Sequence, residues 1–335
     1  MKIKGFRVST NKEWDTIVNN SYCSTYFHTR DWAEIWSSYT NNLLKPHPIL
    51  ITFEDDTHVL LPLSYTTFFK GLGKKYISSP AGTFGGWVSN NRLDKGHIES
   101  LINFLYSISD DLNVRINPYE ETGANYIYKK AISDVTNTLK LDNDFEAIFR
   151  SWTKGHKSAV PKAVKAGIII EKGKNLDDWK AYYEVYQDSI KRWGEKASSN
   201  YKWTLFEEFY KRKSDNITLW LAKHENRIIA GALCFYCNKH IVYWHGAALD
   251  EFFNLRPVNL LMYETIKDGC QRGYKWFDFN PSGGHEGVKS FKKSFGTIEL
   301  NCPVVSHKNL KYSVLNFANN KLNFLKTTLH LGSKK

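Results

Sequence analysis

The sequence has few cysteines and no long apolar stretch, and each absence narrows what the protein can be. Its five cysteines among 335 residues are odd in number and widely scattered. This argues against a disulfide framework and is typical of reduced thiols in the cytoplasm. No run approaches the roughly 18 uninterrupted apolar residues of a membrane span. The first residues also lack the apolar core of a signal peptide. We expect a cytoplasmic protein with no transmembrane segment.

Sequence signatures of metal and nucleotide sites are also absent. There is no Walker loop, no dinucleotide-binding glycine fingerprint and no zinc-protease motif. Cys234 and Cys237 form a Cys-x-x-Cys pair, but no second pair follows at zinc-site spacing. They lie in an apolar run typical of a buried strand, so structural thiols are expected. We expect no metal and no tightly bound cofactor.

The sequence does contain an excess of positive charge. The formal net charge is +12, with a pI near 9.2. This favours an anionic partner, such as a nucleic acid, a phosphorylated small molecule or a lipid surface. A solvated, lysine-rich surface would give the same excess. Apolar residues make up 42% of the chain, enough for a substantial core.

The two halves of the chain repeat one pattern. Residues 49–66 and 217–236 each read as two strands around a polar turn. Each hairpin is followed by a strand, a segment with helical spacing and a last strand that ends in Asn-Pro. Helices are predicted before each hairpin, at 11–20 and 29–39, and at 176–192 and 203–213. The pattern recurs at about 165 residues, which indicates domain duplication.

This repeat predicts a mixed α/β (α+β) fold of two tandem lobes. Each lobe is expected to hold a mostly antiparallel sheet with one parallel pair of strands, flanked by helices. We predict a first lobe at 1–145 and a second lobe at 146–305. Residues 306–335 are predicted to form an amphipathic helical tail. The tail either packs back on the protein or docks on a membrane surface.

Three segments together resemble the FemAB/FemX family of aminoacyl transferases. The most specific is Gly287-Val-Lys-Ser-Phe-Lys-Lys-Ser-Phe-Gly296, which follows a strand ending in Asp278-Phe-Asn-Pro-Ser-Gly-Gly. The second is the basic segment 158–167, and the third is Phe27-His-Thr-Arg-Asp-Trp-Ala33. The similarity covers most of residues 20–305. It implies twin lobes of the GNAT (GCN5-related N-acetyltransferase) type. It also implies transfer of an amino acid from aminoacyl-tRNA to an amine of a cell-wall peptidoglycan precursor.

Two departures from the family bear on the acceptor. Where some members have a phosphate-binding lysine after Trp-Ala, this chain has Glu34. At the end of the first lobe's strand, where an acidic residue can occur, it has Asn117. Both leave room for an acceptor other than a nucleotide-linked precursor.

The reaction needs an oxyanion stabiliser and a proton acceptor. The resemblance implies a functional role for Lys292, which follows a glycine-rich loop and can carry an ammonium into a cleft. Asp278 lies two residues before Asn280 and shares its strand face, so it can orient an amine. His285 is a further candidate acceptor, and so is its neighbour Glu286. In the loop, Gly283 and Gly284 allow close approach of a ligand.

Other candidates come from the predicted strand 241–246 and from the first lobe. Alternation places Tyr243 and His245 on one strand face and Trp244 on the other. Either Tyr243 or His245 is expected to face substrate, with core packing as the alternative. Trp32 and Asn117 complete the candidate substrate-binding set by resemblance.

The donor is expected to meet a basic surface. The segment from Arg150 to Lys165 contains no acid, and its candidate phosphate-binding residues are Arg150, Lys154, Lys157 and Lys162. Arg256 is added from the segment before the helical run 258–266. Acyl-CoA-dependent GNAT enzymes have a glycine-rich pyrophosphate loop there. This chain has Arg256-Pro257 and no glycine, which disfavours ordinary CoA binding.

Three functions remain open. The first is an aminoacyl-tRNA-dependent transferase acting on an amine of an envelope or peptide precursor. The second is an acyl-CoA-dependent N-acyltransferase acting on an amino sugar in surface polysaccharide synthesis. The third is a non-catalytic binding protein for tRNA or phospholipid. In each case the protein is cytoplasmic, with peripheral contact at the inner face of the membrane as an option.

Overall fold

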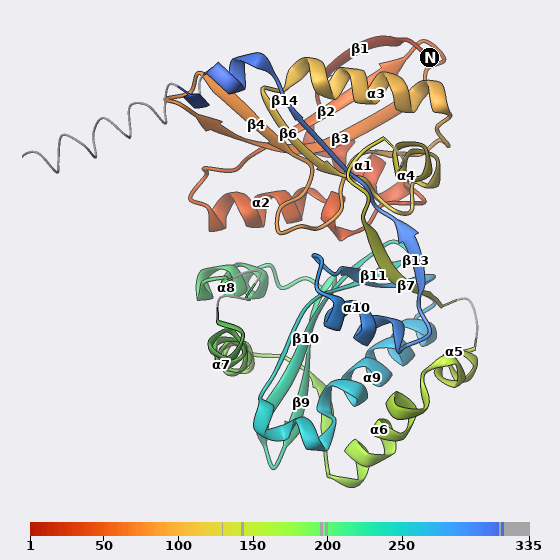
Figure 1. The fold of residues 1–335 in the computed structure, drawn as a ribbon, viewed down its shortest axis with the longest axis vertical. Helices are drawn as coiled ribbons and strands as arrows, with labels where there is room; N and C mark the ends of the chain where they lie inside the picture. The colour runs from red at the N-terminus through yellow and green to blue at the C-terminus, as the bar shows by residue number, and fades with distance from the viewer. Residues whose placement is uncertain (129, 142–143, 195–196, 198–199, 315, 318–335) are drawn as a thin grey trace, which may run out of the picture.

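The chain folds into two lobes, each built on a seven-stranded sheet (Figure 1). The structure, a computed structural model, describes residues 1–128, 130–141, 144–194, 197, 200–314 and 316–317. In the first sheet the strand order is β1-β2-β3-β4-β6-β14, with β5 paired to β3. In the second sheet it is β13-β7-β12-β11-β10-β9-β8. The predicted fold of two tandem α/β lobes is confirmed.

The first lobe contains the N-terminal elements and the last strand. These are β1 (Ile3–Val8), α1 (Asn11–Asn20), the 3₁₀ turn η1 (Tyr26–His28), α2 (Arg30–Tyr39), β2 (Lys45–Phe53), β3 (His58–Phe68), β4 (Gly73–Ile77), β5 (Val88–Ser89), α3 (Lys95–Ile108), β6 (Asp111–Arg115), α4 (Glu121–Tyr128) and β14 (Val304–Lys308). Each predicted hairpin and helix of this half is present. The capping boxes at Thr10 and Asp94 help explain where α1 and α3 begin.

The second lobe contains the elements between them. These are β7 (Val135–Lys140), α5 (Phe145–Ser151), α6 (Lys154–Lys165), β8 (Ile169–Lys172), α7 (Leu176–Trp193), α8 (Trp203–Lys211), β9 (Ile217–His224), β10 (Arg227–Cys237), β11 (His240–Ala248), the 3₁₀ helix η3 (Asp250–Leu255), α9 (Pro257–Gln271), β12 (Trp276–Pro281), α10 (Glu286–Lys293) and β13 (Ile298–Asn301). Helices α7 and α8 cover one face of the sheet, and α9, α6 and α5 lie on the other (Figure 1).

Each lobe contains the predicted parallel pair. In the first lobe β4 runs parallel to β6, and in the second β11 runs parallel to β12. All other strand pairs within the sheets are antiparallel. A parallel pair requires a crossover, which α3 and α9 supply. The carboxyl ends of β6 and β12 therefore occupy equivalent places in the two lobes.

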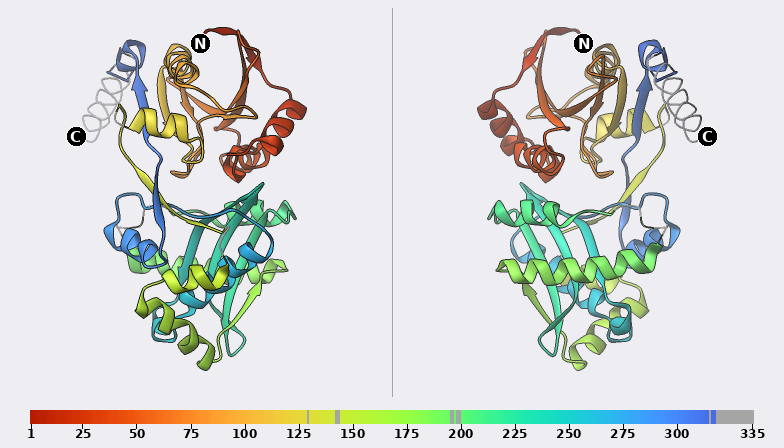
Figure 2. Two further views of the ribbon diagram at one scale, coloured as in Figure 1. Left: turned by 90° about the vertical axis from the view of Figure 1, so that its right-hand side faces the viewer. Right: turned by 90° about the vertical axis from the view of Figure 1, so that its left-hand side faces the viewer.

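The sheets divide the chain at points other than the predicted boundaries at 145 and 305. Strand β7 pairs with β12 and β13, so the second sheet begins before residue 145. Strand β14 pairs with β6, so the chain returns to the first sheet before the predicted tail (Figure 2). Strand β14 thus covers the edge of the first sheet at β6. The repeat within each half of the sequence cannot indicate a strand that returns from the far end of the chain.

The predicted tail at 306–335 is described only in part. Residues 306–308 belong to β14, and residues 310–314 and 316–317 are helical. Leu310, Val314 and Phe317 are exposed along this short stretch. Residues 315 and 318–335 lie outside the described part of the chain. Within the described residues, no helix is both long and apolar enough to cross a membrane.

One hydrophobic core runs through both lobes. It joins the α1 and α2 face of the first sheet to the interior of the second lobe. A separate core lies between the first sheet and α3, and it includes Ile49, Ile51 and Phe53, whereas Leu50 faces the shared core. Because successive strand residues point to opposite faces, a strand covered on both sides is apolar throughout. The shared core fixes one lobe against the other.

Candidate active site

The candidate site lies where β11 and β12 separate. The two strands pair through Val242 and Asp278 and no further, although both continue beyond this point. A β-bulge interrupts the pairing of β11 with β10 between Leu233 and Cys234. Bulges bend and twist a strand, and they are common beside active sites. The carboxyl end of β12 is therefore free of a neighbour on this side.

Asp278 is a fully buried carboxyl group that accepts several hydrogen bonds. The Thr136 hydroxyl donates to Oδ1 at 2.5 Å, and the Asn280 backbone N–H donates to the same oxygen at 2.6 Å. The Tyr119 hydroxyl donates to Oδ2 at 2.7 Å. Burial raises the pKa of Asp278 to about 6, while these three hydrogen bonds and the charge of Lys292 lower it. A carboxylate with that pKa suits proton transfer near neutral pH.

Lys292 lies on α10 with only 4% of its surface exposed. Its Nζ donates to the backbone carbonyl of Asn280 at 2.6 Å. Burial lowers the pKa of Lys292 to about 8, and the charge of Asp278 opposes that change. An ammonium has three donors, and the carbonyl of Asn280 takes one of them. Phe295 on the same segment is fully buried against Phe279 and Trp152, which anchors α10 to the lobe.

Asn280 lies between these two charged groups. Its φ of 62° is in the left-handed region, which asparagine tolerates better than most residues. Its N–H binds Asp278 and its C=O binds Lys292. Its side-chain Oδ1 is buried and has no hydrogen-bond partner in the described part of the structure. The backbone of Asn280 is therefore held at both its N–H and its C=O, and its side-chain oxygen Oδ1 is left to accept a hydrogen bond.

The two predicted strand residues Tyr243 and His245 do not share a face. Across the bulge, Tyr243 pairs with Cys234 and His245 with Leu233, so the two side chains point to opposite sides. His245 packs among Tyr182, Tyr186 and Phe206, and its Nδ1 lies 2.7 Å from the Tyr182 hydroxyl. Tyr243 instead contacts Phe279 of β12. Strict alternation was wrong here because the bulge inserts Trp244.

The other predicted substrate-binding residues are dispersed. Trp32 is 1% exposed and packs against Phe209, Phe235 and Trp244 of the second lobe. Asn117 is equally buried, and its Nδ2 donates to the backbone carbonyl of Cys23 at 2.7 Å. Neither side chain has an exposed surface for a substrate.

The glycine-rich loop is open to solvent. Gly283, Gly284 and His285 are all exposed, and both glycines have positive φ. His285 is the N-cap residue of α10, but its side chain makes no capping hydrogen bond. The loop is therefore positioned beside the buried cluster through Asn280 and α10.

Only two of the predicted phosphate-binding residues, Lys162 and Arg256, line the same pocket. Helix α6 is the expected basic helix, and Lys162 on it lines a pocket of about 430 Å³ together with His156, Asn259 and Arg256. His156 Nδ1 and Asn259 Nδ2 are 2.9 Å apart. Arg256 has left-handed backbone geometry directly before Pro257, the first residue of α9. Arg150, Lys154 and Lys157 do not line this pocket.

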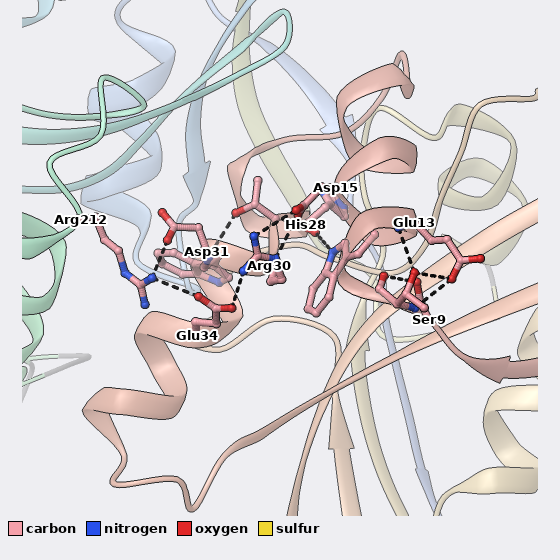
Figure 3. Close-up of polar contacts among 12 residues, drawn as sticks. Ser9, Glu13, Asp15, His28, Arg30, Asp31, Glu34 and Arg212 are labelled. Atoms are coloured by element: carbon pink, nitrogen blue, oxygen red, sulfur yellow. Dashed lines mark hydrogen bonds and ion pairs between the residues drawn. The ribbon is translucent and has the colours of Figure 1, made fainter.

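Glu34 belongs to a network of ion pairs between the lobes (Figure 3). Arg30 binds it at 2.7 Å, and Arg212 of the second lobe binds it at 3.1 Å. Arg212 also binds Asp31 at 2.9 Å, and Arg30 binds Asp15 at 3.0 Å. Three carboxylates thus surround two guanidinium groups. Where the resemblance implies a phosphate site, the cations are already paired.

Sequence reasoning missed Tyr119 and Thr136. Tyr119 follows the first lobe's Asn117-Pro118, and Thr136 is on β7, yet both bind Asp278. Tyr119 is 159 positions from Asp278 in the chain and Thr136 is 142 positions away, so no sequence spacing links them to it. The repeated Asn-Pro ending was the one available signal near Tyr119.

Comparison with known proteins places the second lobe beside one domain model. Residues 154–293 match the model of the acetyltransferase (GNAT) domain. This second-lobe segment is therefore similar to GNAT acetyltransferases. A lipid II:glycine glycyltransferase from Staphylococcus haemolyticus is 32% identical over 93 residues, which cover 25% of this chain. That match spans only 22% of the length of the curated relative.

Solved structures share the fold of this chain across both lobes. FemX matches with a TM-score of 0.70 and 14% identity, covering 93% of this chain and 99% of FemX. The C-terminal domain (DUF2156) of a putative lysylphosphatidylglycerol synthetase from Agrobacterium fabrum matches with a TM-score of 0.55 and 10% identity, covering 93% and 98%. At these identities the likeness concerns the fold alone.

Proposed function

We propose that this protein is an N-acyltransferase whose reaction centre is formed by Asp278, Asn280 and Lys292. One observation carries the proposal: a buried carboxyl and a buried ammonium hold the two backbone ends of Asn280, whose side-chain oxygen is unpartnered in the described structure. Such a cluster is costly for stability, since buried polar groups normally find partners. Perturbed titratable groups at a strand end are typical of functional sites.

The chemistry follows from these groups. The acceptor amine attacks the donor's carbonyl carbon, a C–N bond forms, and the ester C–O bond to the donor breaks. Asp278 accepts a proton from the attacking amine and then gives it to the released donor oxygen, so the step neither gains nor loses a proton. Lys292 stabilises the negative charge on the carbonyl oxygen in the tetrahedral intermediate. Asn280 Oδ1 accepts a hydrogen bond from the amine. Because Asp278 and Lys292 are buried, a substrate reaches them only after neighbouring residues move.

Aminoacyl-tRNA is the donor that the surface favours. Helix α6 carries Lys154, Lys157, Lys162 and Lys165 without an acid, and Lys162 shares a pocket with Arg256. Cationic side chains of this kind bind nucleic-acid phosphates. Helix α9 opens with Arg256-Pro257, and proline removes one of the N–H groups that a pyrophosphate would bind.

For the acceptor we propose an amine of a lipid-linked peptidoglycan precursor. The name of the matched relative gives lipid II as that protein's substrate. The pairing of Arg30 and Arg212 with Asp15, Asp31 and Glu34 leaves no unpaired guanidinium in that cluster for a nucleotide diphosphate. We therefore propose an acceptor that carries no nucleotide.

A lipid-linked acceptor agrees with a location on the cytoplasmic side of the membrane. Leu310, Val314 and Phe317 are exposed at spacings of four and three residues, beside Lys308 and Lys311. An apolar helical face flanked by lysines suits an anionic membrane surface. Sedimentation with vesicles of anionic phospholipid should carry the protein down. Equal recovery with neutral vesicles, or with a Leu310→Ser/Phe317→Ser variant, would contradict this.

Acyl-CoA is the second candidate donor, and the pocket at the start of α9 is the observation in its favour. A helix N-terminus with Lys162 and Arg256 beside it can hold a pyrophosphate. An amino sugar would then be the acceptor class.

One experiment separates the candidates. Purified protein is offered ¹⁴C-glycyl-tRNA or ¹⁴C-acetyl-CoA, with lipid II or a panel of amino sugars. We expect label to pass from the tRNA to lipid II, and RNase pretreatment to abolish transfer. Transfer from acetyl-CoA would establish the second candidate. Transfer from neither, together with retained tRNA or phospholipid binding, would indicate a non-catalytic binding protein.

The donor pocket has a matched control on one helix. Lys162 and Lys165 are both exposed residues of α6, but only Lys162 lines the pocket. Lys162→Ala should raise the KM for aminoacyl-tRNA several-fold, whereas Lys165→Ala should change it little. Equal effects of the two variants would show that general positive charge, and no defined pocket, attracts the donor.

A further inference from the structure

We propose that Tyr119, from the connection that follows β6, is a positioning residue for Asp278, so that a first-lobe side chain completes the reaction centre of the second lobe. This inference rests on the proposed role of Asp278. The contact joins residues 159 positions apart in the chain, and its O–O distance is 2.7 Å. Both side chains are buried.

The available protons determine the direction of this hydrogen bond. The Tyr119 hydroxyl lies 2.7 Å from Asp278 Oδ2 and 3.2 Å from Thr138 Oγ1. The Thr138 hydroxyl donates its proton to the backbone carbonyl of Phe277 at 3.0 Å. With Thr138's proton used there, the single proton of Tyr119 goes to the shorter contact. Tyr119 therefore donates to Asp278 and favours the ionised carboxylate, which only accepts.

The first lobe holds Tyr119 in place by a local turn. Asn117 Oδ1 accepts from the Tyr119 backbone N–H at 3.1 Å, an Asx turn across Pro118. Asn117 Nδ2 is anchored on the backbone carbonyl of Cys23. The Tyr119 ring then lies between aromatic groups of both lobes. Its ring centroid is 6.1 Å from that of Phe84 in the first lobe and 4.2 Å from that of His240 in the second.

The Tyr119 hydroxyl has a role other than filling space in the core. Phenylalanine would fill the same space, yet Tyr119 brings a polar atom into a fully buried site, where an unpaired hydroxyl is costly. The hydroxyl meets one oxygen of Asp278, while Thr136 and the Asn280 N–H meet the other. Tyr119 thus fixes the rotation of the Asp278 carboxylate. In that orientation the other carboxylate oxygen keeps its hydrogen bond from the Asn280 N–H.

Other titratable groups lie near Asp278 or near its neighbours Lys292 and Tyr119, and they have to be accounted for in any pH measurement. They come from α10, β11, the segment before β7 and the segment after β13, and they are Lys292, His240, Asp134 and Cys302. Burial lowers the pKa of His240 to about 3 and raises that of Cys302 to about 12. Neither His240 nor Cys302 changes charge between pH 5 and 7, whereas the pKa of Asp278, about 6, lies in that window.

Carboxyl-carbon NMR of the full chain, ¹³C-labelled at aspartate, tests the inference without any assay of activity. The Asp278 signal is assigned by its loss in Asp278→Asn, and its titration is compared in wild type and Tyr119→Phe. Loss of a donor to the charged form should move the Asp278 titration upward by about 0.5–1 pH unit. The control Thr138→Val disturbs the same cluster without removing a donor to Asp278, and it should leave that titration in place.

The outcomes separate this inference from the proposed function. An unchanged Asp278 titration in Tyr119→Phe would overturn the positioning role, whatever the activity. An equal shift in Thr138→Val would also overturn it, because general loosening of the cluster would then be the cause. If Asp278 titrates higher but the acid limb of the kcat/KM profile stays in place, Tyr119 positions Asp278 and the proposed base is wrong. We expect both the titration and the acid limb to move together.

Discussion

The two lobes end their second parallel strand with the same dipeptide, Asn-Pro, and use it differently. In the first lobe, Asn117 has both ends of its side chain bonded, to Cys23 and to the Tyr119 N–H. In the second, Asn280 has left-handed backbone geometry and an unpartnered Oδ1 within the described residues. Two residues earlier, the first lobe has Arg115 and the second has Asp278.

This difference shows that equivalent positions in the two lobes serve different purposes, folding in the first lobe and the proposed chemistry in the second. A duplicated fold supplies two equivalent strand ends, and fold alone does not assign chemistry to either. In the first lobe, Arg115 is paired with Asp134, and Gly85 forms a bridge to Ile116 beside the strand end. The groups at that strand end are therefore already paired. In the second lobe the corresponding groups are buried, perturbed in pKa and incompletely paired, as a reaction centre requires.

The largest expected effect comes from Lys292. Lys292→Met should lower kcat/KM by about 10²–10³-fold, because it removes the proposed donor to the oxyanion. Lys293→Met is the matched control. That lysine is an exposed neighbour which pairs with Glu299 at 3.0 Å, and its loss should have little effect. Steady-state kinetics checks both, and a folded Lys292→Met with wild-type activity would move the reaction away from this lobe.

Asn280 should show the next largest effect on activity. Asn280→Gly removes the proposed acceptor for the amine but keeps a residue at ease with positive φ. A hydrogen bond to a charged group contributes about 1.5–3 kcal/mol, so we expect kcat/KM to fall about 10–100-fold. Unfolding in urea should change little. If stability fell while activity held, Asn280 would resemble its first-lobe counterpart.

Asn117 should behave in the opposite way. Asn117→Ala leaves the buried carbonyl of Cys23 without its donor, which costs about 1–3 kcal/mol of unfolding free energy. Its effect on kcat should not exceed that of Tyr119→Phe, since Asn117 acts only through the Tyr119 turn. Urea midpoints compared with wild type test the cost. No loss of stability would remove the contrast between the two lobes.

The last prediction concerns the pH dependence of stability. The pKa of Lys292 is about 8 in the folded protein, against an ordinary value of 10.5. Between these values the unfolded chain binds more protons, so the unfolding free energy should rise as pH increases from 8 to 10.5. Lys292→Met should lack this rise. Asp278 acts in the acid range, where its raised pKa makes stability fall as pH increases from about 4 to 6.

Denaturant unfolding across both pH windows measures these slopes. Asp278→Asn serves as the control in the acid window, and Lys292→Met in the alkaline one. Slopes identical to wild type in both variants would show that other groups govern the pH dependence.

Local sequence patterns determined the elements of both lobes. Apolar runs around polar turns fixed the hairpins β2–β3 and β9–β10, and Pro257 marked the start of α9. Repetition of those elements determined the twin fold with one parallel pair in each lobe. The Phe-Lys-Lys-Ser-Phe-Gly element pointed to Lys292, which does lie at the end of β12 beside Asn280. These are properties of neighbours in the chain.

Only the tertiary structure decided which side chains meet. Tyr119 and Thr136 reach Asp278 because β7 and the connection after β6 converge there, and no periodicity encodes that. The bulge at Trp244 placed His245 against Tyr182 and Phe206, on the face opposite Tyr243 and against the alternation of the strand. The exchange of β14 into the first sheet moved the lobe boundary. Contacts distant in sequence depend on how whole elements pack, so a single sequence determines the parts and the packing determines the site.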